Sequence, residues 1–285
     1  MTITIRDLQA YKAEGRRFAM LTAYDYPTAQ IVDEAGVAVV LVGDSIANNE
    51  LGYPDTLPVT MDEMLHHTRA VRRGVTRALL VGDLPFMSYQ ASVEEGMRNA
   101  GRFLKEAGAN AVKLEGPEIE LTSRLSRSGI PVMAHVGLTP QSVNQMGGYR
   151  VQGKSEDDAE RIERECVALQ RAGAFAVVLE GIPAGLGRHL TELLAIPTIG
   201  IGAGPHCDGQ VLVFHDMIGL NARTPKFVKQ YAHLRTEISR AVGEFISEVE
   251  TGAFPDDAHS YGGGQVYGGS DRDQVAASPP AEVAR

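Results

Sequence analysis

The chain has 285 residues, of which 44% are hydrophobic and 22% are charged, and its formal net charge at pH 7 is −9. This composition is typical of a globular protein with a sizeable core, built as one large barrel or two modest domains. The acidic balance would repel a phosphate backbone, and no basic stretch alternates with aromatic residues, so we expect no nucleic-acid partner.

Apolar runs alternate with amphipathic segments along the chain. Residues 4–15 predict a short N-terminal helix that closes the bottom of the fold, and residues 226–252 predict a long C-terminal helix. Between them, the stretches 61–73, 92–107 and 155–172 are examples of predicted helices. The predicted strands cover residues 18–25, 37–44, 77–83, 111–115, 130–135, 175–180, 197–202 and 210–216.

Eight strands that alternate with helices favour a closed (β/α)₈ TIM barrel, with an open doubly wound sheet as the alternative. We expect a single catalytic domain over residues 1–254. Residues 255–285 are rich in Gly, Ser, Pro and Ala and contain few large apolar side chains, so we expect a mostly disordered tail.

Five apolar runs end on an ionisable side chain, namely Asp44, Asp83, Glu115, His135 and Glu180. In a parallel sheet or barrel, the carboxyl ends of the strands meet at one face, where substrates and metals bind. The sequence therefore predicts that these five side chains converge on one pocket.

Three of them, Asp44, Asp83 and Glu115, end successive predicted strands. Carboxylates held close together repel one another, and a divalent cation or the protonation of one member relieves the repulsion. Ligands that are all oxygen favour Mg²⁺ ahead of Mn²⁺. Each acid alone could equally well cap a helix or a turn, so the predicted magnesium site depends on their joint occurrence.

Lys113 and Glu115 are two residues apart in a predicted strand, so both side chains should point into the barrel. There Lys113 would pair with a carboxylate, anchor an anionic substrate, or do both. Glu180 is the candidate general base, with a structural cap as the alternative. His135 would contact the substrate or a carboxylate, but a satisfied core histidine fits the pattern equally well.

Two further features of the sequence can be explained without a functional role, namely residues 200–209 and the two cysteines. The glycine-rich segment could bind phosphate through backbone N–H groups, but a tight turn explains it equally well. Cys166 and Cys207 lack the spacing of a disulfide or zinc site, and nothing marks Cys207 as a nucleophile. Residues 1–30 show no export signal, and no run approaches the roughly 20 apolar residues of a membrane span. We therefore expect a cytoplasmic protein without membrane contact.

Short motifs spread along the chain resemble those of the ketopantoate hydroxymethyltransferase family. They occur in the family's order from about residue 3 to residue 260. The matching segments are TAYDYPTAQ (22–30), VGDS (42–45), TLPVT (56–60), DLPFMSY (83–89), GANAVKLEG (108–116), GLTPQSVNQMGGYRVQG (137–153), PTIGIGAG (197–204), CDGQVLV (207–213) and FPDDAHS (254–260).

The resemblance implies a barrel of the phosphoenolpyruvate/pyruvate type that assembles as a homodecamer. It implies a hydroxymethyl transfer from 5,10-methylenetetrahydrofolate to 3-methyl-2-oxobutanoate, giving 2-dehydropantoate for pantothenate biosynthesis through an enolate that Mg²⁺ stabilises. By the same resemblance Glu180 is the catalytic base. The metal site would be formed by Asp44, Asp83 and Glu115, the last partly through water. The keto acid would be bound by Asp44, Ser45, Asp83, Lys113 and His135.

The chain departs from the family pattern after VGDS, where residues 46–50 read IANNE in place of a Leu-Gly-Met sequence. We expect this loop to be mobile and to cover the site. The nearest alternative function is an isocitrate-lyase-like lyase on the same barrel, but neither cysteine has the surroundings that such a lyase requires. A barrel that only binds ligands is a further alternative, and the intact set of site residues argues against it.

Overall fold

The computed structural model describes residues 2–261. The chain divides into two compact units, Met1–His233 and a second unit that begins at Leu234. Of the tail predicted over residues 255–285, the part from residue 262 onward lies outside the described residues. Residues 255–261 include a short 3₁₀ helix, η2 (Asp257–His259), and the domain boundary at residue 254 stays a prediction.

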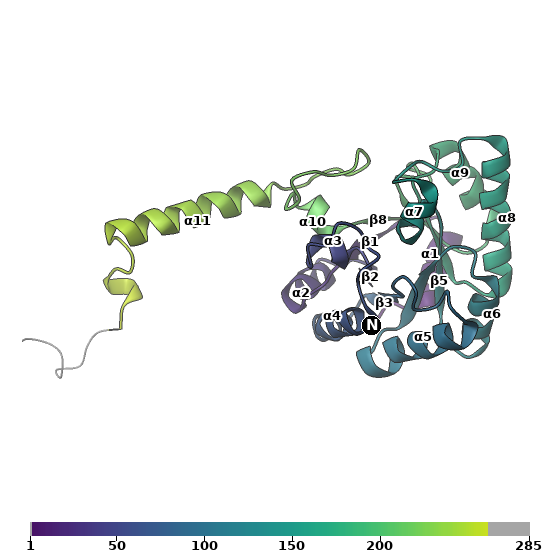
Figure 1. The fold of residues 1–285 in the computed structure, drawn as a ribbon, viewed down its shortest axis with the longest axis horizontal. Coiled ribbons are helices and arrows are strands. Elements are labelled where there is room, and N and C mark those ends of the chain that lie inside the picture. The colour runs from purple at the N-terminus through teal and green to yellow at the C-terminus, as the bar shows by residue number, and fades with distance from the viewer. Residues whose placement is uncertain (1, 262–285) are drawn as a thin grey trace, which may run out of the picture. The chain divides into compact units, whose positions relative to one another are not determined.

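The first unit is a closed barrel of parallel strands in the order β1 to β8, with β8 paired to β1 (Figure 1). The closure confirms the predicted (β/α)₈ barrel and excludes the open sheet. The strands are β1 (Phe18–Thr22), β2 (Val39–Val42), β3 (Leu79–Asp83), β4 (Ala111–Glu115), β5 (Val132–Gly137), β6 (Ala176–Glu180), β7 (Thr198–Ile201) and β8 (Gly209–Leu212).

Helices lie between most of the strands and cover the outside of the barrel. The three helices predicted at 61–73, 92–107 and 155–172 are confirmed, each starting after a Thr or Ser whose hydroxyl caps the first turn. The helices are α1 (Ile5–Ala13), α2 (Tyr26–Glu34), α3 (Ile46–Asn49), α4 (Met61–Gly74), α5 (Val93–Ala107), α6 (Ile119–Arg127), η1 (Pro140–Ser142), α7 (Val143–Met146), α8 (Glu156–Ala172), α9 (Ala184–Leu193), α10 (Phe214–Met217) and α11 (Leu234–Thr251).

Two predicted boundaries near the C-terminus were wrong. The strand predicted at 210–216 ends at Leu212, because the N–H of Phe214 donates to Thr22 Oγ1 (3.0 Å) and the chain turns into α10. The helix predicted from residue 226 starts at Leu234. Before it, the backbone N–H of Tyr231 donates to Met217 O (2.8 Å), which binds this segment to α10 instead of extending a helix.

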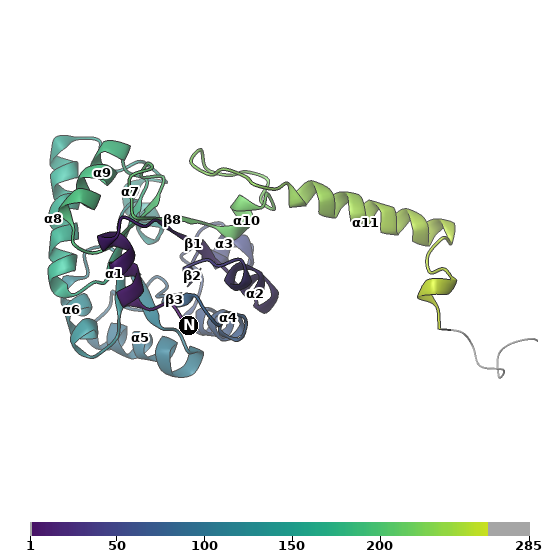
Figure 2. The same ribbon diagram turned by 180° about the vertical axis from the view of Figure 1, so that it is seen from behind.

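Helix α1 closes the end of the barrel at which the strands begin, as predicted. Leu8 is fully buried in the same cluster as the inward side chains of the strands, and Ile5 and Tyr11 pack against that cluster. Figure 2 shows α1 across this end of the barrel. The opposite end, where the strands finish, is therefore the end open to a ligand.

The interior of the barrel changes from apolar to polar along β4. In β4, Val112 and Leu114 pack outward under the helices, whereas Ala111 joins the interior cluster. Lys113 and Glu115 share the parity of Ala111 and are buried inside, as the two-residue spacing predicted. The carboxyl end of the interior is thus lined by charge.

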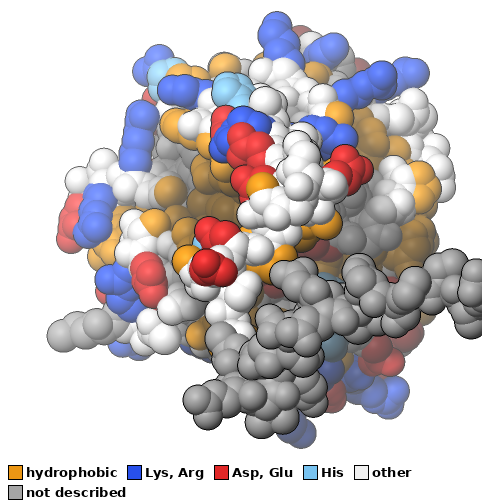
Figure 3. All heavy atoms as spheres, turned by 90° about the vertical axis from the view of Figure 1, so that its left-hand side faces the viewer, with side chains coloured by type: hydrophobic (Ala, Val, Ile, Leu, Met, Phe, Trp, Pro, Cys, Tyr) orange, Lys and Arg blue, Asp and Glu red, His pale blue; other side chains and the backbone are white. Residues whose placement is uncertain are grey.

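None of the helices within residues 2–261 combines the length and apolar character needed to span a membrane. On the face drawn in Figure 3, hydrophobic side chains lie among basic and acidic ones.

Candidate active site

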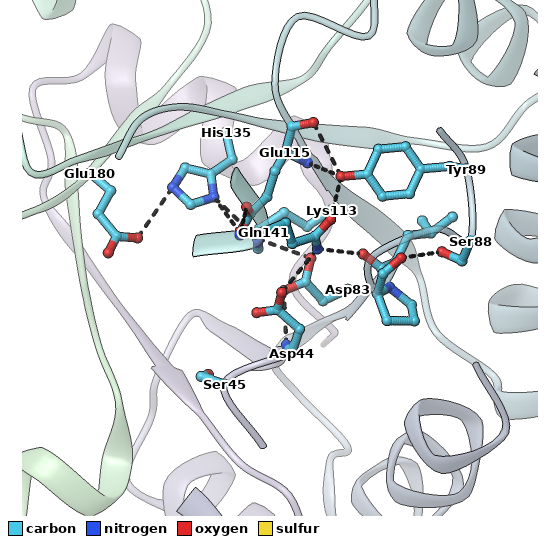
Figure 4. A network of polar contacts seen from close by, with 12 residues as sticks. Asp44, Ser45, Asp83, Ser88, Tyr89, Lys113, Glu115, His135, Gln141 and Glu180 are labelled. Carbon is cyan, nitrogen blue, oxygen red and sulfur yellow. Dashed lines mark hydrogen bonds and ion pairs between the residues drawn. The ribbon is translucent and has the colours of Figure 1, made fainter. Parts of the chain in front are cut away.

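A cavity of about 100 Å³ lies at the carboxyl end of the barrel. Every site residue predicted from the sequence lines it, together with apolar side chains from β1, β2, β6, β7 and β8. Figure 4 shows how the polar side chains lie around it. The predicted residues on the cavity wall are Asp44, Ser45, Asp83, Lys113, Glu115, His135 and Glu180.

Strand register explains why these side chains meet. Asp83 at the end of β3 is the register partner of Lys113 in β4, and Glu115 at the end of β4 is the partner of His135 in β5. Asp44 lies two residues beyond the end of β2, where its backbone N–H donates to Asp83 Oδ2 (3.0 Å). Short strands that end at one level therefore place the charged side chains in adjacent positions.

The carboxylates of Asp44 and Asp83 are buried beside each other. Burial raises the pKa of Asp44 well above its ordinary value, and the neighbouring carboxylates of Asp83 and Glu115 raise it further. Burial also raises the pKa of Asp83, although Lys113 opposes this effect. Burial is thus the main cause of both shifts, and the one buried lysine of the cluster offsets it only in part.

Lys113 is the buried cation of the cluster. Its Nζ lies 3.0 Å from Asp83 Oδ1 and 3.5 Å from Glu115 Oε1. Burial alone would lower the pKa of Lys113, but Asp83, Glu115 and Asp44 raise it above its ordinary value. Lys113 therefore stays charged, and in turn it lowers the pKa of Glu115 against the effect of burial.

His135 stands between Glu115 and Glu180 (Figure 4). Its Nδ1 lies 3.3 Å from Glu115 Oε1, and its Nε2 lies 3.2 Å from Glu180 Oε2. Burial and Lys113 lower the pKa of His135, but Glu115 and Glu180 together raise it to about 9. The ring therefore lies between two carboxylates, and Lys113 Nζ is also 3.3 Å from its Nδ1.

Ser45 lies at the start of α3, and its Oγ is 2.8 Å from the hydroxyl of Tyr24. Tyr24 is fully buried, and its own backbone carbonyl lies 2.7 Å from His67 Nδ1. Thr56, from the segment between α3 and α4, also lines the cavity. The segment after β2 thus already contributes to the wall, where the sequence predicted a covering loop.

Sequence reasoning missed Gln141 and Tyr89, which bind the acidic cluster from its far side. Gln141 Nε2 donates to Asp44 Oδ2 (2.9 Å), and the Tyr89 hydroxyl lies 2.8 Å from Gln141 Oε1. Both side chains are buried. The motif that contains Gln141 was visible in the sequence, but a single loop glutamine has no spacing that would mark it.

The residues fit a divalent cation held by two carboxylates. Within residues 2–261, no group of three or more His, Cys, Asp or Glu side chains is placed to hold a metal ion by itself. Buried Oδ1 of Asp83, however, accepts no hydrogen bond, although Lys113 Nζ lies near it. Because Mg²⁺ often binds through one or two carboxylates and keeps several waters, Asp44 and Asp83 suit it, with Glu115 contributing through water.

The glycine-rich segment and the cysteines play no part in this cavity's polar wall. Asp208, within residues 200–209, accepts hydrogen bonds from Thr198 N (2.8 Å) and Lys12 Nζ (2.8 Å) at the opposite end of the barrel. Residues 202–208 connect β7 to β8 through bends and a turn, and the phosphate interpretation stays a prediction. Cys166 and Cys207 are both free and buried.

The chain matches the family model described as ketopantoate hydroxymethyltransferase over residues 2–257. It is 58% identical over 262 residues to 3-methyl-2-oxobutanoate hydroxymethyltransferase of Syntrophus aciditrophicus, covering 91% of this chain and 96% of that one. It is also 58% identical over 258 residues to the protein of the same name from a Cyanothece species, covering 90% and 99% of the two chains.

Among solved structures, the fold is similar to that of phosphonopyruvate hydrolase. The TM-score is 0.61 at 14% sequence identity, and the match covers 92% of each chain. At this identity the likeness concerns the fold alone. The relatives above 50% identity are therefore the ones that identify the family.

Proposed function

The chain belongs to the ketopantoate hydroxymethyltransferase family and is a transferase, and we propose that it makes 2-dehydropantoate from 3-methyl-2-oxobutanoate. The one-carbon donor in this proposal is 5,10-methylenetetrahydrofolate, and the product serves pantothenate biosynthesis. The observation that carries the proposal is the charged cavity at the carboxyl end of the barrel, where all residues expected for this reaction converge.

We assign Asp44 and Asp83 to a Mg²⁺ ion, with Glu115 acting through water. The carboxylates of Asp44, Asp83, Glu115 and Glu180 outnumber the cations Lys113 and His135, and a divalent cation would balance the excess. When bound, Mg²⁺ supplies Lewis-acid chemistry that favours negative charge on the 2-oxo group of the keto acid.

Lys113 and Ser45 would bind the keto acid. Lys113 is a permanent cation at the cavity wall and offsets the charge of the substrate carboxylate. Ser45 presents a hydroxyl whose other partner, Tyr24, holds it in place (2.8 Å). The buried surroundings strengthen both interactions, because water competes with them only weakly.

Glu180 would remove the proton from C3 of the keto acid. Its side chain is 16% exposed, which leaves it more accessible than the other carboxylates of the cavity. His135 Nε2 lies 3.2 Å from its Oε2, near enough for electrostatic attraction but without hydrogen-bond geometry. The carbanion formed at C3 would then attack the methylene carbon of the folate as one of its two C–N bonds breaks, and the freed nitrogen would take up the proton that Glu180 removed. Water would then displace the second nitrogen from this carbon, so that the product gains the hydroxyl group and tetrahydrofolate leaves with the remaining proton.

We propose further that the protein acts in the cytoplasm as a homodecamer. Helix α11 supports self-association, since Ile238, Val242, Phe245 and Val249 on it are each about half exposed. Their alternating spacing of four and three residues is that of a helix that packs against another helix. Sedimentation of the purified protein, compared with a Phe245→Glu variant, would show whether this face mediates assembly.

The direct test is formation of 2-dehydropantoate from the two substrates, with Mg²⁺ and after removal of metal with EDTA. The proposal predicts product with Mg²⁺, none with EDTA, and recovery when Mg²⁺ is restored in excess. Omission of the folate should abolish the product, whereas a lyase on this barrel would cleave its 2-oxo acid substrate without folate. No product in the presence of Mg²⁺ and both substrates would overturn the proposal.

A further inference from the structure

Both polar atoms of the Gln141 side chain form hydrogen bonds with residues around the site. Its side chain lies in the segment after β5, and the residue is only 5% exposed. The Nε2 group donates to Asp44 Oδ2 (2.9 Å) and to Leu84 O (2.9 Å). The Oε1 atom accepts from the Tyr89 hydroxyl (2.8 Å) and from Gln90 Nε2 (3.0 Å). A buried amide with four partners is fixed in one position.

The main chain of Gln141 binds the same cluster from a second direction. Its backbone N–H donates to Glu115 Oε2 (3.0 Å). A single residue therefore contacts carboxylates that come from two different strands, Asp44 after β2 and Glu115 at the end of β4. Figure 4 shows Gln141 between Tyr89 and the acidic side chains.

Tyr89 determines which way the amide of Gln141 points. Its hydroxyl accepts a hydrogen bond from the N–H of Glu115 (3.1 Å), and of the two acceptors near its single proton, Gln141 Oε1 (2.8 Å) is closer than Glu115 O (3.2 Å). A tyrosine hydroxyl carries its proton at neutral pH and can donate one hydrogen bond. With Tyr89 donating to Oε1, the amide NH₂ faces Asp44 and Leu84 O, as the Leu84 carbonyl, which can only accept, also requires.

We propose that Gln141 is a positioning residue that holds the carboxylate of Asp44 in the orientation in which it binds the divalent cation, an inference that rests on the proposed function. By holding Oδ2, Gln141 leaves Oδ1 of Asp44 to the cation. Outer groups that orient a metal-binding carboxylate typically change metal affinity by about 10- to 100-fold when removed.

The test measures binding of Mn²⁺ alone by electron paramagnetic resonance, without substrate or turnover. Gln141→Leu should raise the dissociation constant for Mn²⁺ by about 10- to 100-fold. Tyr89→Phe removes the proton that orients the amide while it keeps the ring, so it should weaken binding by a smaller factor.

Gln170 offers a matched control far from the site. Its Oε1 accepts from the backbone N–H groups of Ala195 (2.7 Å) and Ile196 (3.2 Å), so it is also a satisfied glutamine that fixes a loop. Gln170→Leu should lower the urea midpoint and leave Mn²⁺ affinity unchanged. A merely structural role for Gln141 would produce this same pattern.

The outcomes separate the inference from the function beneath it. If the parent protein binds Mn²⁺ and makes product, but a folded Gln141→Leu binds Mn²⁺ within twofold of the parent, the positioning role is refuted alone. If Gln141→Leu does not fold, parental affinity in Tyr89→Phe refutes the role. If the parent neither binds Mn²⁺ nor makes product, the inference and the proposed function both fall.

Discussion

The two ends of the barrel both contain aspartates with little exposure to solvent, but the surroundings of these aspartates differ. Asp33 and Asp208 lie at the end where strands begin, and Asp44 and Asp83 lie at the end where strands finish. The first pair is surrounded by hydrogen-bond donors, whereas the second pair faces other carboxylates. The comparison separates acids that hold the fold together from acids that are available for chemistry.

Asp33 shows the structural arrangement. Its carboxylate accepts from the backbone N–H groups of Thr76 (3.0 Å), Arg77 (3.0 Å) and Ala78 (2.7 Å) and from the Thr76 hydroxyl (2.8 Å). It thereby joins the end of α2 to the residues that enter β3. Burial would raise the pKa of Asp33, but these donors lower it below its ordinary value.

Asp44 and Asp83 have fewer donors than their burial requires. Burial raises the pKa of each, and the neighbouring carboxylates add to the effect. An ionised group whose pKa is raised by folding opposes folding, whereas one whose pKa is lowered favours it. Unfavourable burial that a bound cation would relieve is the physical mark of a functional site.

The largest effect is expected for Asp83→Ala. The change removes a carboxylate assigned to the cation and the main partner of Lys113, so both metal binding and turnover should fall, turnover by on the order of 10³-fold. Stability in urea should also fall, because Lys113 and the N–H of Asp44 each lose a buried partner, although the loss of a repulsive charge offsets part of this effect. Turnover within tenfold of the parent would show that the carboxyl end does not work as described.

Asp33→Asn should lower the stability of the protein without lowering its turnover. An amide cannot accept all the hydrogen bonds that the carboxylate accepts, and buried N–H groups would be left unpaired. We expect a loss of roughly 2–4 kcal/mol in the free energy of unfolding, measured in urea. The kcat of the folded fraction should stay at the parental value, and a large fall in kcat would break the separation of the two ends.

Asp44→Asn should stabilise the metal-free protein. The variant keeps an oxygen for Gln141 and removes a charge whose burial is unfavourable, so the free energy of unfolding should rise by on the order of 1 kcal/mol. The measurement is urea unfolding in EDTA, with Asp33→Asn beside it. A loss of stability similar to that of Asp33→Asn would mean that both ends are structural.

The pH dependence of stability should also separate the ends, by a smaller amount. Because the pKa of Asp33 is lowered in the folded state, its contribution is present above the ordinary aspartate pKa of about 3.9. The contribution is lost as the pH falls from there through the folded-state pKa. The difference in urea midpoint between the parent and Asp33→Asn should therefore be constant from pH 7 to 5 and shrink below about pH 4.

Much of the barrel could be predicted from the sequence because its signals are local. Uninterrupted apolar runs predicted the strands, and the amphipathic stretches predicted as helices at 92–107 and 155–172 form α5 and α8. The two-residue spacing of Lys113 and Glu115 placed both inside the barrel. The charged residues at the strand ends predicted where the cavity lies, because parallel strands of a barrel end at one level.

The remaining features depend on contacts between distant segments. The donors to Asp33 lie more than 40 positions away in sequence, and Gln141 reaches Asp44 across 97 positions. The segment before α11 leaves the helical path because Tyr231 binds Met217 O. The periodicity of a sequence carries no information about contacts between distant segments. Gln141 and Tyr89 were therefore missed, although the charged residues of the site were predicted.

The most direct test is exchange of the C3 proton of 3-methyl-2-oxobutanoate in deuterated water with Mg²⁺ and without folate, for the parent and Glu180→Gln. The parent should catalyse exchange. Glu180→Gln should bind the keto acid and Mg²⁺ but exchange about 10²- to 10⁴-fold more slowly, since the base is gone. Exchange at the parental rate in Glu180→Gln would contradict the account of how this cavity works.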